Sequence, residues 1–345
     1  MYMDLELPCR PDGIDAFLAQ PTPGAVESLR RLHGDMIIIG AGGKMGPTLC
    51  LMASEALRKA GSSSRVKAVS RFSNAKVRQA LEAAGVETIV CDLTDRKAVA
   101  SLPEAPNVIF LAGMKFGTAD ATEMTWVMNT VVPSYVGERY RGSRIVVFST
   151  GCVYSFSSVF GGGSTENDPT QPMGDYANSC VGRERVFSYY SKQYGTPVTL
   201  FRLNYSIDFR YGVLLDVAMK VASNEPVDVT TGSVNVIWQG DACARALQCL
   251  EIADAPAVPI NITGPETISI RSLALRFGEL FGTTPLITGK EHEHLWLSNA
   301  SKSFGLFGYP TVSLDQMVKW CAAWVQSGGE IFEKPTQFEV RSGVF

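Results

Sequence analysis

The glycine-rich segment IIIGAGGKMGPTL, residues 37–49, constrains the fold of this chain more than any other stretch. Gly40, Gly43 and Gly46 lie between an apolar run and a run with helical spacing, so a tight turn joins a strand to a helix. Glycines at such a turn let backbone N–H groups approach a pyrophosphate, which the helix dipole then stabilises. A flexible glycine loop is the alternative, but the strand and helix around the turn favour a dinucleotide site.

From residue 35 onward, apolar strand-sized runs alternate with amphipathic helical segments. Such alternation is typical of a parallel sheet with helices on both faces. The helix after the glycine turn is expected to begin at Pro47 and to stop at Gly61. The sequence therefore predicts an α/β fold: a Rossmann-type doubly wound parallel sheet with a smaller C-terminal substrate lobe. The expected strands are 36–40, 65–70, 87–91, 107–113, 144–150 and 197–203.

The same pattern predicts four parts of the chain. Residues 1–33 form an N-terminal extension, in which apolar residues at helical spacing indicate a short helix that packs on the domain. Residues 34–203 form the Rossmann dinucleotide-binding domain, and residues 331–345 form a tail. Residues 204–330 mostly form the substrate lobe, with strands that partly return to the sheet. The lobe includes two expected amphipathic helices, within 269–282 and 313–329.

Composition narrows the class of partner. The formal net charge of -3 gives no basic surface for nucleic acid, so a small polar substrate or a protein partner is expected. The N-terminus has no apolar signal region and the longest apolar runs are strand-sized, so neither a signal peptide nor a membrane span is expected. The eight cysteines form no CxxC pair, which indicates reduced thiols in a cytoplasmic protein.

The choice of dinucleotide follows from charge. An NAD site usually carries a carboxylate at the end of the second strand, to hold the ribose 2′-hydroxyl group. Here that strand ends in Ser70 and Arg71, and Lys44 and Met45 lie inside the glycine turn. Two cations without an acid fit a 2′-phosphate, so NADP is preferred and NAD remains possible. The alternative is that Lys44 and Arg71 are solvated surface charges.

Between about residues 35 and 325 the chain resembles the extended short-chain dehydrogenase/reductase superfamily, the NAD(P)-dependent sugar epimerases and dehydratases. Besides GAGGKMG, the resemblance rests on CDLTD (91–95), FLAGMKFG (110–117), FSTGCVY (148–154), DYANSCVGRE (175–184), RLNY (202–205) and VIWQGDACARAL (236–247). It implies a carbohydrate-like or sugar-acid substrate and a homodimer formed through two helices of the Rossmann half. It also implies that the cofactor contacts Asp92, Leu93, Leu111, Ala112 and Gly113, and that Asn129 is a structural asparagine.

The resemblance assigns chemistry to Tyr176 and Thr150, with Ser149 just before the threonine. In the family, the tyrosine transfers a proton to or from a substrate oxygen that the threonine or serine orients. A lysine four residues after the tyrosine holds the nicotinamide ribose and lowers the pKa of the tyrosine. In the stretch YANSC that cofactor-contacting position is Cys180. A neutral thiol does neither task well, and a reactive thiol at Cys180 is a further alternative.

Three interpretations of this departure stay open. In the first, another cation replaces the lysine, either Lys115 on the loop after the fourth strand or Arg183 on the helix face of Tyr176. In the second, Tyr176 acts as a general acid in a non-redox isomerase or lyase reaction. In the third, the chain binds NADP(H) as a regulatory protein without turnover.

Several other residues have two interpretations each. The pair His292 and His294 has a spacing possible for metal ligands, but no matching cluster exists, and no metal is expected. Trp238 and Trp296 fit either a sugar-stacking surface or a buried core. Arg202 and Arg210 fit either a substrate anion or structural ion pairs.

Overall fold

The computed structural model describes residues 12–115, 121–332, 334 and 336–343. The first 11 residues of the predicted N-terminal extension, and Phe116 and Gly117 of the motif FLAGMKFG, lie outside the described residues. None of the described helices is both long and apolar enough to cross a membrane.

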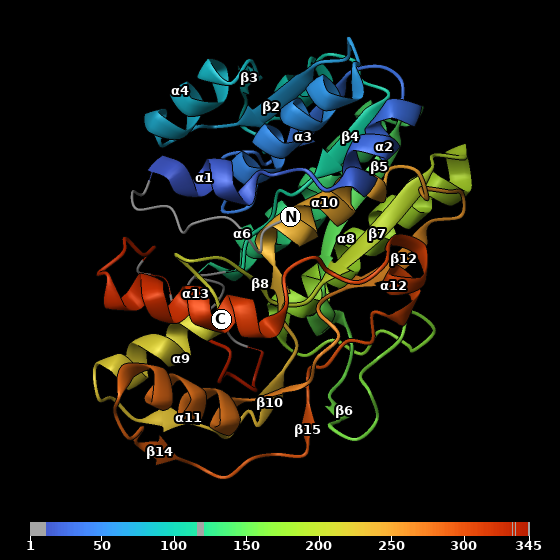
Figure 1. Cartoon of the computed structure of the whole chain (residues 1–345). Coiled ribbons are helices and arrows are strands. Elements are labelled where there is room, and N and C mark those ends of the chain that lie inside the picture. The colour runs from blue at the N-terminus through green and yellow to red at the C-terminus, as the bar shows by residue number, and fades with distance from the viewer. Residues whose placement is uncertain (1–11, 116–120, 333, 335, 344–345) are drawn as a thin grey trace.

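A seven-stranded, wholly parallel sheet forms the centre of the larger lobe (Figure 1). Its spatial order is β3-β2-β1-β4-β5-β7-β12, which is the doubly wound order that the sequence predicts. All six predicted strands are confirmed. These six are β1 (Met36–Ile39), β2 (Val66–Ser70), β3 (Glu87–Val90), β4 (Asn107–Phe110), β5 (Arg144–Thr150) and β7 (Val198–Leu203). The seventh strand of the sheet is β12 (Val258–Ile262).

Both faces of the sheet are covered, because successive side chains of a strand point to opposite faces. Ile38 packs beneath one layer of helices and Ile37 and Ile39 beneath the other. The first layer consists of α2 (Pro23–Arg31), α3 (Gly46–Ala60), α4 (Ala75–Ala83) and α10 (Gln239–Gln248). The second consists of α5 (Arg96–Ala100), α7 (Val132–Arg139) and α8 (Gly174–Tyr194), and α7 continues α6 (Thr122–Trp126) through the π-helical turn η1 (Val127–Val131).

The helix after the glycine turn begins and ends as the sequence predicts. In α3, Pro47 lies in the first turn, and Gly61 caps the C-terminus in the left-handed conformation with a φ of 69°. The predicted N-terminal helix is also confirmed: in α2, Ala25 and Leu29 are buried in the core between the sheet and the first layer of helices.

A second hydrophobic core belongs to the smaller lobe, which occupies the lower part of Figure 1. Its helices are α9 (Val213–Ala222), α11 (Ile270–Phe281) and α13 (Leu314–Gln326), so the two helices predicted there are confirmed. Short strand pairs join the loops: β8 (Ser206–Ile207) with β11 (Ile237–Trp238), β9 (Val227–Asp228) with β14 (Ile287–Thr288), β10 (Ser233–Val234) with β13 (Ile268–Ser269), and β6 (Ser157–Ser158) with β15 (His294–Leu295).

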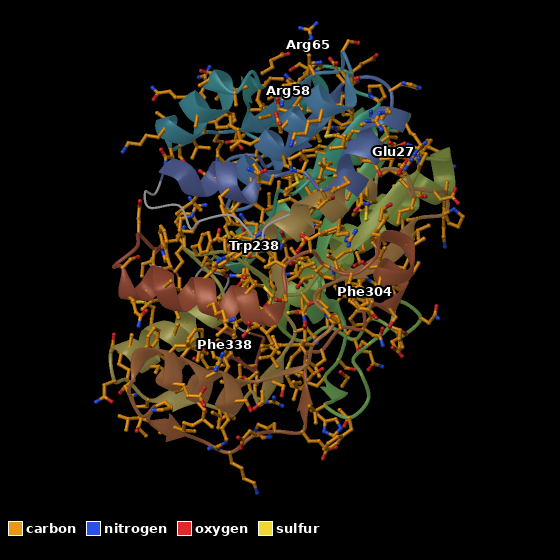
Figure 2. All side chains as sticks on the ribbon, in the orientation of Figure 1. Glu27, Arg58, Arg65, Trp238, Phe304 and Phe338 are labelled. Carbon is orange, nitrogen blue, oxygen red and sulfur yellow. The ribbon has the colours of Figure 1, made fainter. Side chains whose placement is uncertain are left out.

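The two lobes share segments from distant parts of the chain. The helix α1 (Asp12–Leu18) inserts Phe17 among the aromatic rings of the small lobe, edge-on to Trp238 and Trp320. In the other direction, α10 and β12 return from the second half of the chain to the Rossmann layer. Trp238 lies where the lobes meet and Phe338 lies within the small lobe, both almost fully buried (Figure 2). The remaining described helices are η2 (Gly151–Val153) and α12 (Ser301–Phe307).

Candidate active site

The glycine turn follows β1 and forms a cradle that only small residues can line. Gly40 has a φ of +94°, and a Cβ there would lie 2.5 Å from the backbone N of Ala112. A Cβ on Gly46 would lie 2.1 Å from the backbone O of Ala41. Gly43 donates its N–H to the carbonyl of Gly40 and closes the turn above the N-terminus of α3. These features fit a pyrophosphate held by backbone N–H groups and the helix dipole.

The carboxyl ends of β2 and β3 form the neighbouring edge of the sheet. Ser70 lies directly beside the turn, since a Cβ on Gly42 would meet its Oγ at 2.4 Å. Arg71 is exposed. The Asp92 carboxylate accepts hydrogen bonds from the N–H and hydroxyl of Thr94, and these bonds, together with the charge of Arg71, lower its pKa. This edge therefore carries one cation and one carboxylate.

Lys44 does not join Arg71 at this edge, so the prediction of a paired cation site for a 2′-phosphate is wrong for Lys44. Its side chain turns the other way, into the space between the lobes. The Nζ atom donates to the carbonyl of Ser206 at 3.1 Å and lies 3.9 Å from the ring centroid of Tyr211. Burial lowers the pKa of this amine to about 8, although Asp208 nearby acts in the opposite direction.

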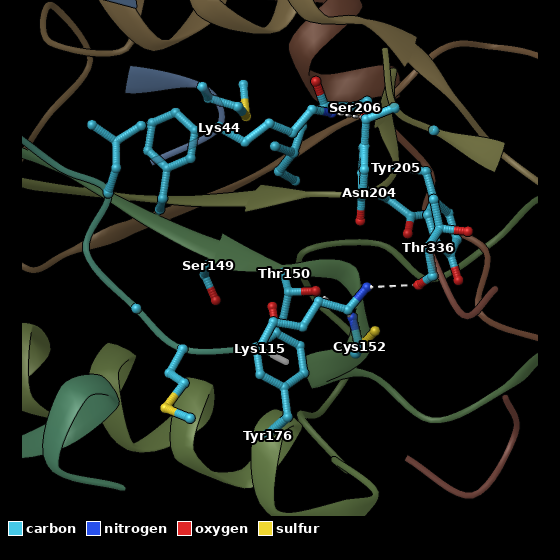
Figure 3. Close-up of a pocket in the computed structure, with 18 of the residues that line it drawn as sticks. Lys44, Lys115, Ser149, Thr150, Cys152, Tyr176, Asn204, Tyr205, Ser206 and Thr336 are labelled. Atoms are coloured by element: carbon cyan, nitrogen blue, oxygen red, sulfur yellow. Dashed lines mark hydrogen bonds between the residues drawn. The ribbon is translucent and has the colours of Figure 1, made fainter. Parts of the chain in front are cut away.

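A pocket of about 260 Å³ lies beyond the turn, where the carboxyl ends of β1, β4 and β5 face the small lobe. Figure 3 shows its lining, with Thr150 above Tyr176 and Lys44 on the opposite wall. Ligand sites of doubly wound folds occur at this edge of the sheet. The lining includes nine of the residues discussed from the sequence: Lys44, Met45, Leu111, Gly113, Lys115, Ser149, Thr150, Tyr176 and Arg183.

Thr150 and Tyr176 form a hydrogen-bonded pair in this pocket. The Thr150 Oγ1 atom accepts the N–H of Cys152 at 3.2 Å, which leaves its hydroxyl proton for the phenol oxygen. Burial raises the pKa of Tyr176 well above its ordinary value, whereas Arg183 and the Thr150 hydroxyl lower it. At neutral pH the phenol therefore carries its proton.

Ser149 also lines the pocket, but its hydroxyl group is hydrogen-bonded to a residue that does not line the pocket. It donates to Glu184 Oε1 at 2.6 Å. Glu184 in turn pairs with Arg202 through two hydrogen bonds of 2.9 and 2.7 Å, and both side chains are buried. Arg202 is therefore a structural residue, and the buried pair supports the strand end that carries Ser149 and Thr150.

Cys180 is packed away from the pocket that the family lysine would reach. Its side chain is 1% exposed and contacts Val153, Tyr154 and the lower side of Tyr176. Cys180 is not among the residues that line the pocket, and its thiol is three atoms shorter than a lysine side chain; its contact with a cofactor remains a prediction. Burial raises the pKa of the thiol to about 11, which makes it a neutral, unreactive group.

A buried arginine lies one helical turn beyond Cys180. Arg183 Nη1 donates to the carbonyl of Phe148 at 2.7 Å, and Nη2 donates to Asn129 Oδ1. Its Nε finds no acceptor among the described residues, and none of their carboxylates pairs with it. A Cβ on Gly113 would lie 2.4 Å from Arg183 Nη2, so the guanidinium lies directly against the end of β4.

Asn129 holds this arrangement together from the η1 turn. Its carboxamide accepts the N–H of Met114 and donates to the carbonyl of the same residue, both at 3.0 Å. It also donates to Ser179 at 2.9 Å and accepts from Arg183. The structural role implied for Asn129 therefore has a physical basis: one buried amide joins the loop after β4 to helix α8.

Lys115 reaches across the pocket from the loop after β4. Its Nζ donates to the carbonyl of Thr336 at 3.2 Å, and its side chain passes next to Thr150 and Tyr176 (Figure 3). Burial lowers the pKa of the amine, while Cys152, Asp216 and Cys180 act in the opposite direction. The predicted position of Lys115 at the site is thus in agreement with its contacts.

The small lobe and the C-terminal tail complete the pocket with residues that the sequence did not single out as site residues. They are Asn204, Tyr205, Ser206, Tyr211, Gly212, Val213 and Thr336. RLNY (202–205) was a weak signal for the first two, through its place in the family order. For Thr336 there was no signal, because nothing in its local sequence indicates that the tail returns to the pocket.

The other residues with two interpretations are structural. Arg210 pairs with Asp15 at 2.7 Å, and Trp238 is 1% exposed within the small-lobe core. Trp296 is 7% exposed and donates to the carbonyl of Tyr154. Within the described residues, no group of three or more His, Cys, Asp or Glu is placed to hold a metal ion.

The strand order and the glycine turn define a Rossmann-type protein of the dinucleotide-binding class. The profile of the NAD dependent epimerase/dehydratase family matches residues 36–233, which is more than half of the chain. The chain belongs to this family. A comparison with curated protein sequences gave no match.

Solved structures with the same fold cover most of the chain. The UDP-glucuronic acid 4-epimerase from Bacillus cereus in complex with NAD has 18% identity and a TM-score of 0.70, with 85% of this chain and 98% of that chain covered. The UDP-glucose 4-epimerase of Thermotoga maritima with UDP-glucose has 18% identity and a TM-score of 0.69, over 85% and 99%. MoeE5 in complex with UDP-glucuronic acid and NAD has 18% identity and a TM-score of 0.69, over 86% and 100%.

Proposed function

We propose that this protein is an NAD(P)-dependent oxidoreductase of the epimerase/dehydratase type that acts on a carbohydrate or sugar-acid substrate. The observation that carries the proposal is the Thr150–Tyr176 pair, which lies in the pocket at the carboxyl edge of a Rossmann sheet. A protein that only binds a dinucleotide needs no buried phenol next to a hydroxyl donor. The pair is therefore evidence for proton transfer at this site.

The residues present fit a nicotinamide dinucleotide. The cradle of Gly40, Gly43 and Gly46 would hold the pyrophosphate, and the loop after β4 with Gly113 would hold the nicotinamide end. When bound, the nicotinamide exchanges a hydride with a substrate carbon. A preference for NADP now rests on Arg71 and Ser70, whereas Asp92 at the same edge supports NAD, the dinucleotide named for two of the related structures.

The proton work belongs to Tyr176. As a phenol it donates a proton to a substrate carbonyl oxygen, and in the reverse direction its phenolate accepts the proton of the hydroxyl group. Thr150 donates to the phenol oxygen and favours the phenolate. Ser149 is tied to Glu184 and holds the end of β5 in place.

Arg183 is the cation that replaces the missing lysine in this proposal. Its positive charge lowers the pKa of Tyr176 and of Cys180, the position of the family lysine. It lies against Gly113, at the end of β4, and it lacks a carboxylate partner among the described residues. A buried cation without a counter-ion is unfavourable for folding, and such groups are retained where they act on a ligand. Lys115 points instead toward the small lobe, on the substrate side.

A homodimer and a cytoplasmic location remain part of the proposal. Exposed apolar side chains support the dimer: Trp126 and Val131 on the α6–η1 segment are 38% exposed, and Tyr189 and Tyr194 on α8 are 55% and 44% exposed. The α6–η1 segment and α8 also pack against each other, on the side of the sheet where the Rossmann helices α7 and α8 lie. Light scattering after size-exclusion chromatography measures the mass directly.

The experiment that tests the function combines binding and turnover. Calorimetric titrations with NAD⁺, NADH, NADP⁺ and NADPH measure cofactor binding. A panel of sugars and sugar acids is screened for absorbance change of the reduced nicotinamide and, by chromatography of the sugars, for conversions without net redox change. Tyr176→Phe removes the proton and keeps the ring. Retained binding with lost turnover supports the enzyme, whereas tight binding without turnover of any panel member indicates the regulatory alternative. Turnover that Tyr176→Phe leaves unchanged refutes the role of Tyr176.

A further inference from the structure

Two ammonium groups converge on the pocket from opposite walls. Lys44 comes from the glycine turn and reaches Ser206, and Lys115 comes from the loop after β4 and reaches Thr336. Lys115 is among the groups that lower the pKa of Lys44, so the two charges are close enough to interact. Among the described lining residues there is no aspartate or glutamate, so the pocket wall is cationic.

The C-terminal segment 336–343, here called the strap, closes the small-lobe side of this pocket. The N–H and hydroxyl of Thr336 both donate to Asp216 of α9, and the carbonyl of Phe338 accepts from Thr231 at 3.0 Å. At its far end, Gly343 lies against Gly174 at the start of α8, since a Cβ on Gly174 would lie 2.2 Å from the Gly343 carbonyl oxygen. The strap thus joins the small lobe to the helix that carries Tyr176.

The space behind the strap is filled. Phe338 is 1% exposed and, with Trp296 and the outer side of Tyr205, encloses a cavity of only about 10 Å³. Such a cavity has room for about one water molecule. A substrate that extended from Tyr176 toward Phe338 would therefore meet packed side chains.

We infer that the pocket accepts a small free sugar acid, whose carboxylate lies between Lys44 and Lys115, and not a nucleotide-linked sugar. This inference rests on the proposed function and narrows its substrate. The pocket volume of about 260 Å³ has to hold the reacting end of the cofactor as well as the substrate, which leaves space for a molecule of one sugar ring. A carboxylate gains charge-assisted hydrogen bonds from two partly desolvated ammonium groups.

Asp216 is the acidic group that bears on this charge balance. It attracts Lys115 electrostatically, but its Oδ2 atom already accepts both the N–H and the hydroxyl of Thr336, and burial raises its pKa. Asp208 and Cys243 raise the pKa of Lys44, whereas Arg210 lowers it. The two carboxylates that attract the ammonium groups, Asp208 and Asp216, are not among the residues that line the pocket.

The test uses the full-length protein saturated with its cofactor. Calorimetry compares D-glucuronate, D-galacturonate and D-mannuronate with their parent hexoses, with glucose 6-phosphate and with UDP-glucuronate. At least one hexuronate is expected to bind about tenfold or more tightly than its parent hexose, which is the gain of one charged hydrogen bond. UDP-glucuronate and glucose 6-phosphate are expected to bind more weakly than that hexuronate.

Lys115→Met provides the matched perturbation, because it keeps length and apolar volume but removes the charge. It is expected to abolish the preference for the hexuronate. Lys302→Met is the control, since Lys302 also donates to a backbone carbonyl, that of Pro259 at 2.9 Å, but lies outside the pocket. Cofactor affinity and thermal unfolding of Lys115→Met show whether the variant is folded.

Equal binding of hexuronates and hexoses, a preference unchanged in Lys115→Met, or tighter binding of UDP-glucuronate or of the sugar phosphate would each overturn the inference. Failure of every hexuronate to bind while the cofactor binds would also overturn it and leave the proposed function standing. Failure of the cofactor itself to bind would instead remove the proposed function.

Discussion

Arg183→Met tests the replacement of the family lysine most directly. The guanidinium donates to Phe148 at 2.7 Å and to Asn129, and charged hydrogen bonds contribute about 1.5–3 kcal/mol each. Their loss is offset, because Met also removes a buried cation without a carboxylate partner among the described residues, at a relief of several kcal/mol. We therefore expect the free energy of unfolding to change by less than about 2 kcal/mol.

Ligand binding should respond more strongly than folding. If Arg183 contacts the nicotinamide end of the cofactor, loss of one charged hydrogen bond weakens the affinity for NAD⁺ by about 10- to 150-fold. The pKa of Tyr176 should also rise further, because one of the groups that lower it is gone. Turnover in the direction that needs the phenolate then moves to higher pH.

The assay is calorimetric titration with NAD⁺, together with the pH profile of any turnover found. Arg185→Met is the control, because Arg185 is exposed on the same helix and donates to Thr170 at 3.2 Å. The double variant Arg183→Met/Cys180→Lys should regain most of the lost affinity, since the lysine restores a cation at the family position. Unchanged NAD⁺ affinity and an unshifted pH profile in Arg183→Met would refute the reasoning.

Four further results are expected. Lys44→Met should raise the free energy of unfolding at pH 7 by about 2–3 kcal/mol, because burial lowers the pKa of Lys44 from 10.5 to about 8 and so disfavours its charged form. Urea titrations should show that this gain in stability shrinks as the pH rises from 8 to 10.5. Arg202→Met should cost about 3–5 kcal/mol in the same assay by leaving the Glu184 carboxylate buried alone, and adding Glu184→Gln should recover part of it. Iodoacetamide should not label Cys180 in the folded protein at pH 7, as mass spectrometry of peptides can establish, since its thiol has a pKa of about 11. Arg71→Ala should weaken NADP⁺ about tenfold and leave NAD⁺ unchanged in calorimetry if a 2′-phosphate is bound there; equal effects on both would assign Arg71 no part in the choice.

Local patterns were enough to predict the sheet. Strand-sized apolar runs, the glycine turn and the helix between Pro47 and Gly61 all depend on neighbours within a few residues, and the structure confirms each of them. The place of Thr150 and Tyr176 in one pocket also followed from the order of motifs, because the carboxyl ends of parallel strands share one edge of the sheet.

The direction of long side chains could not be predicted in this way. Lys44 was expected beside Arg71, yet it donates to Ser206, 162 residues away, because the small lobe offers a carbonyl and an aromatic face there. Lys115 likewise finds Thr336, at a separation of 221 residues. A lysine side chain has four rotatable bonds beyond its backbone, so its partner depends on whichever distant segment the tertiary fold brings near.

The sequence by itself thus determined the family, the sheet, the glycine turn and the absence of lysine from YANSC, since all of these depend on residue identity and short spacings. Only the tertiary structure decided which cation lies beside Tyr176, where the tail closes the pocket, and what charge its wall presents. In the sequence, Lys115 was the proposed substitute for the missing lysine, and Arg183 was a second cation on the helix face of Tyr176. Burial and the fixed bonds of Asn129 set Arg183 against β4, while the strap draws Lys115 to the substrate side.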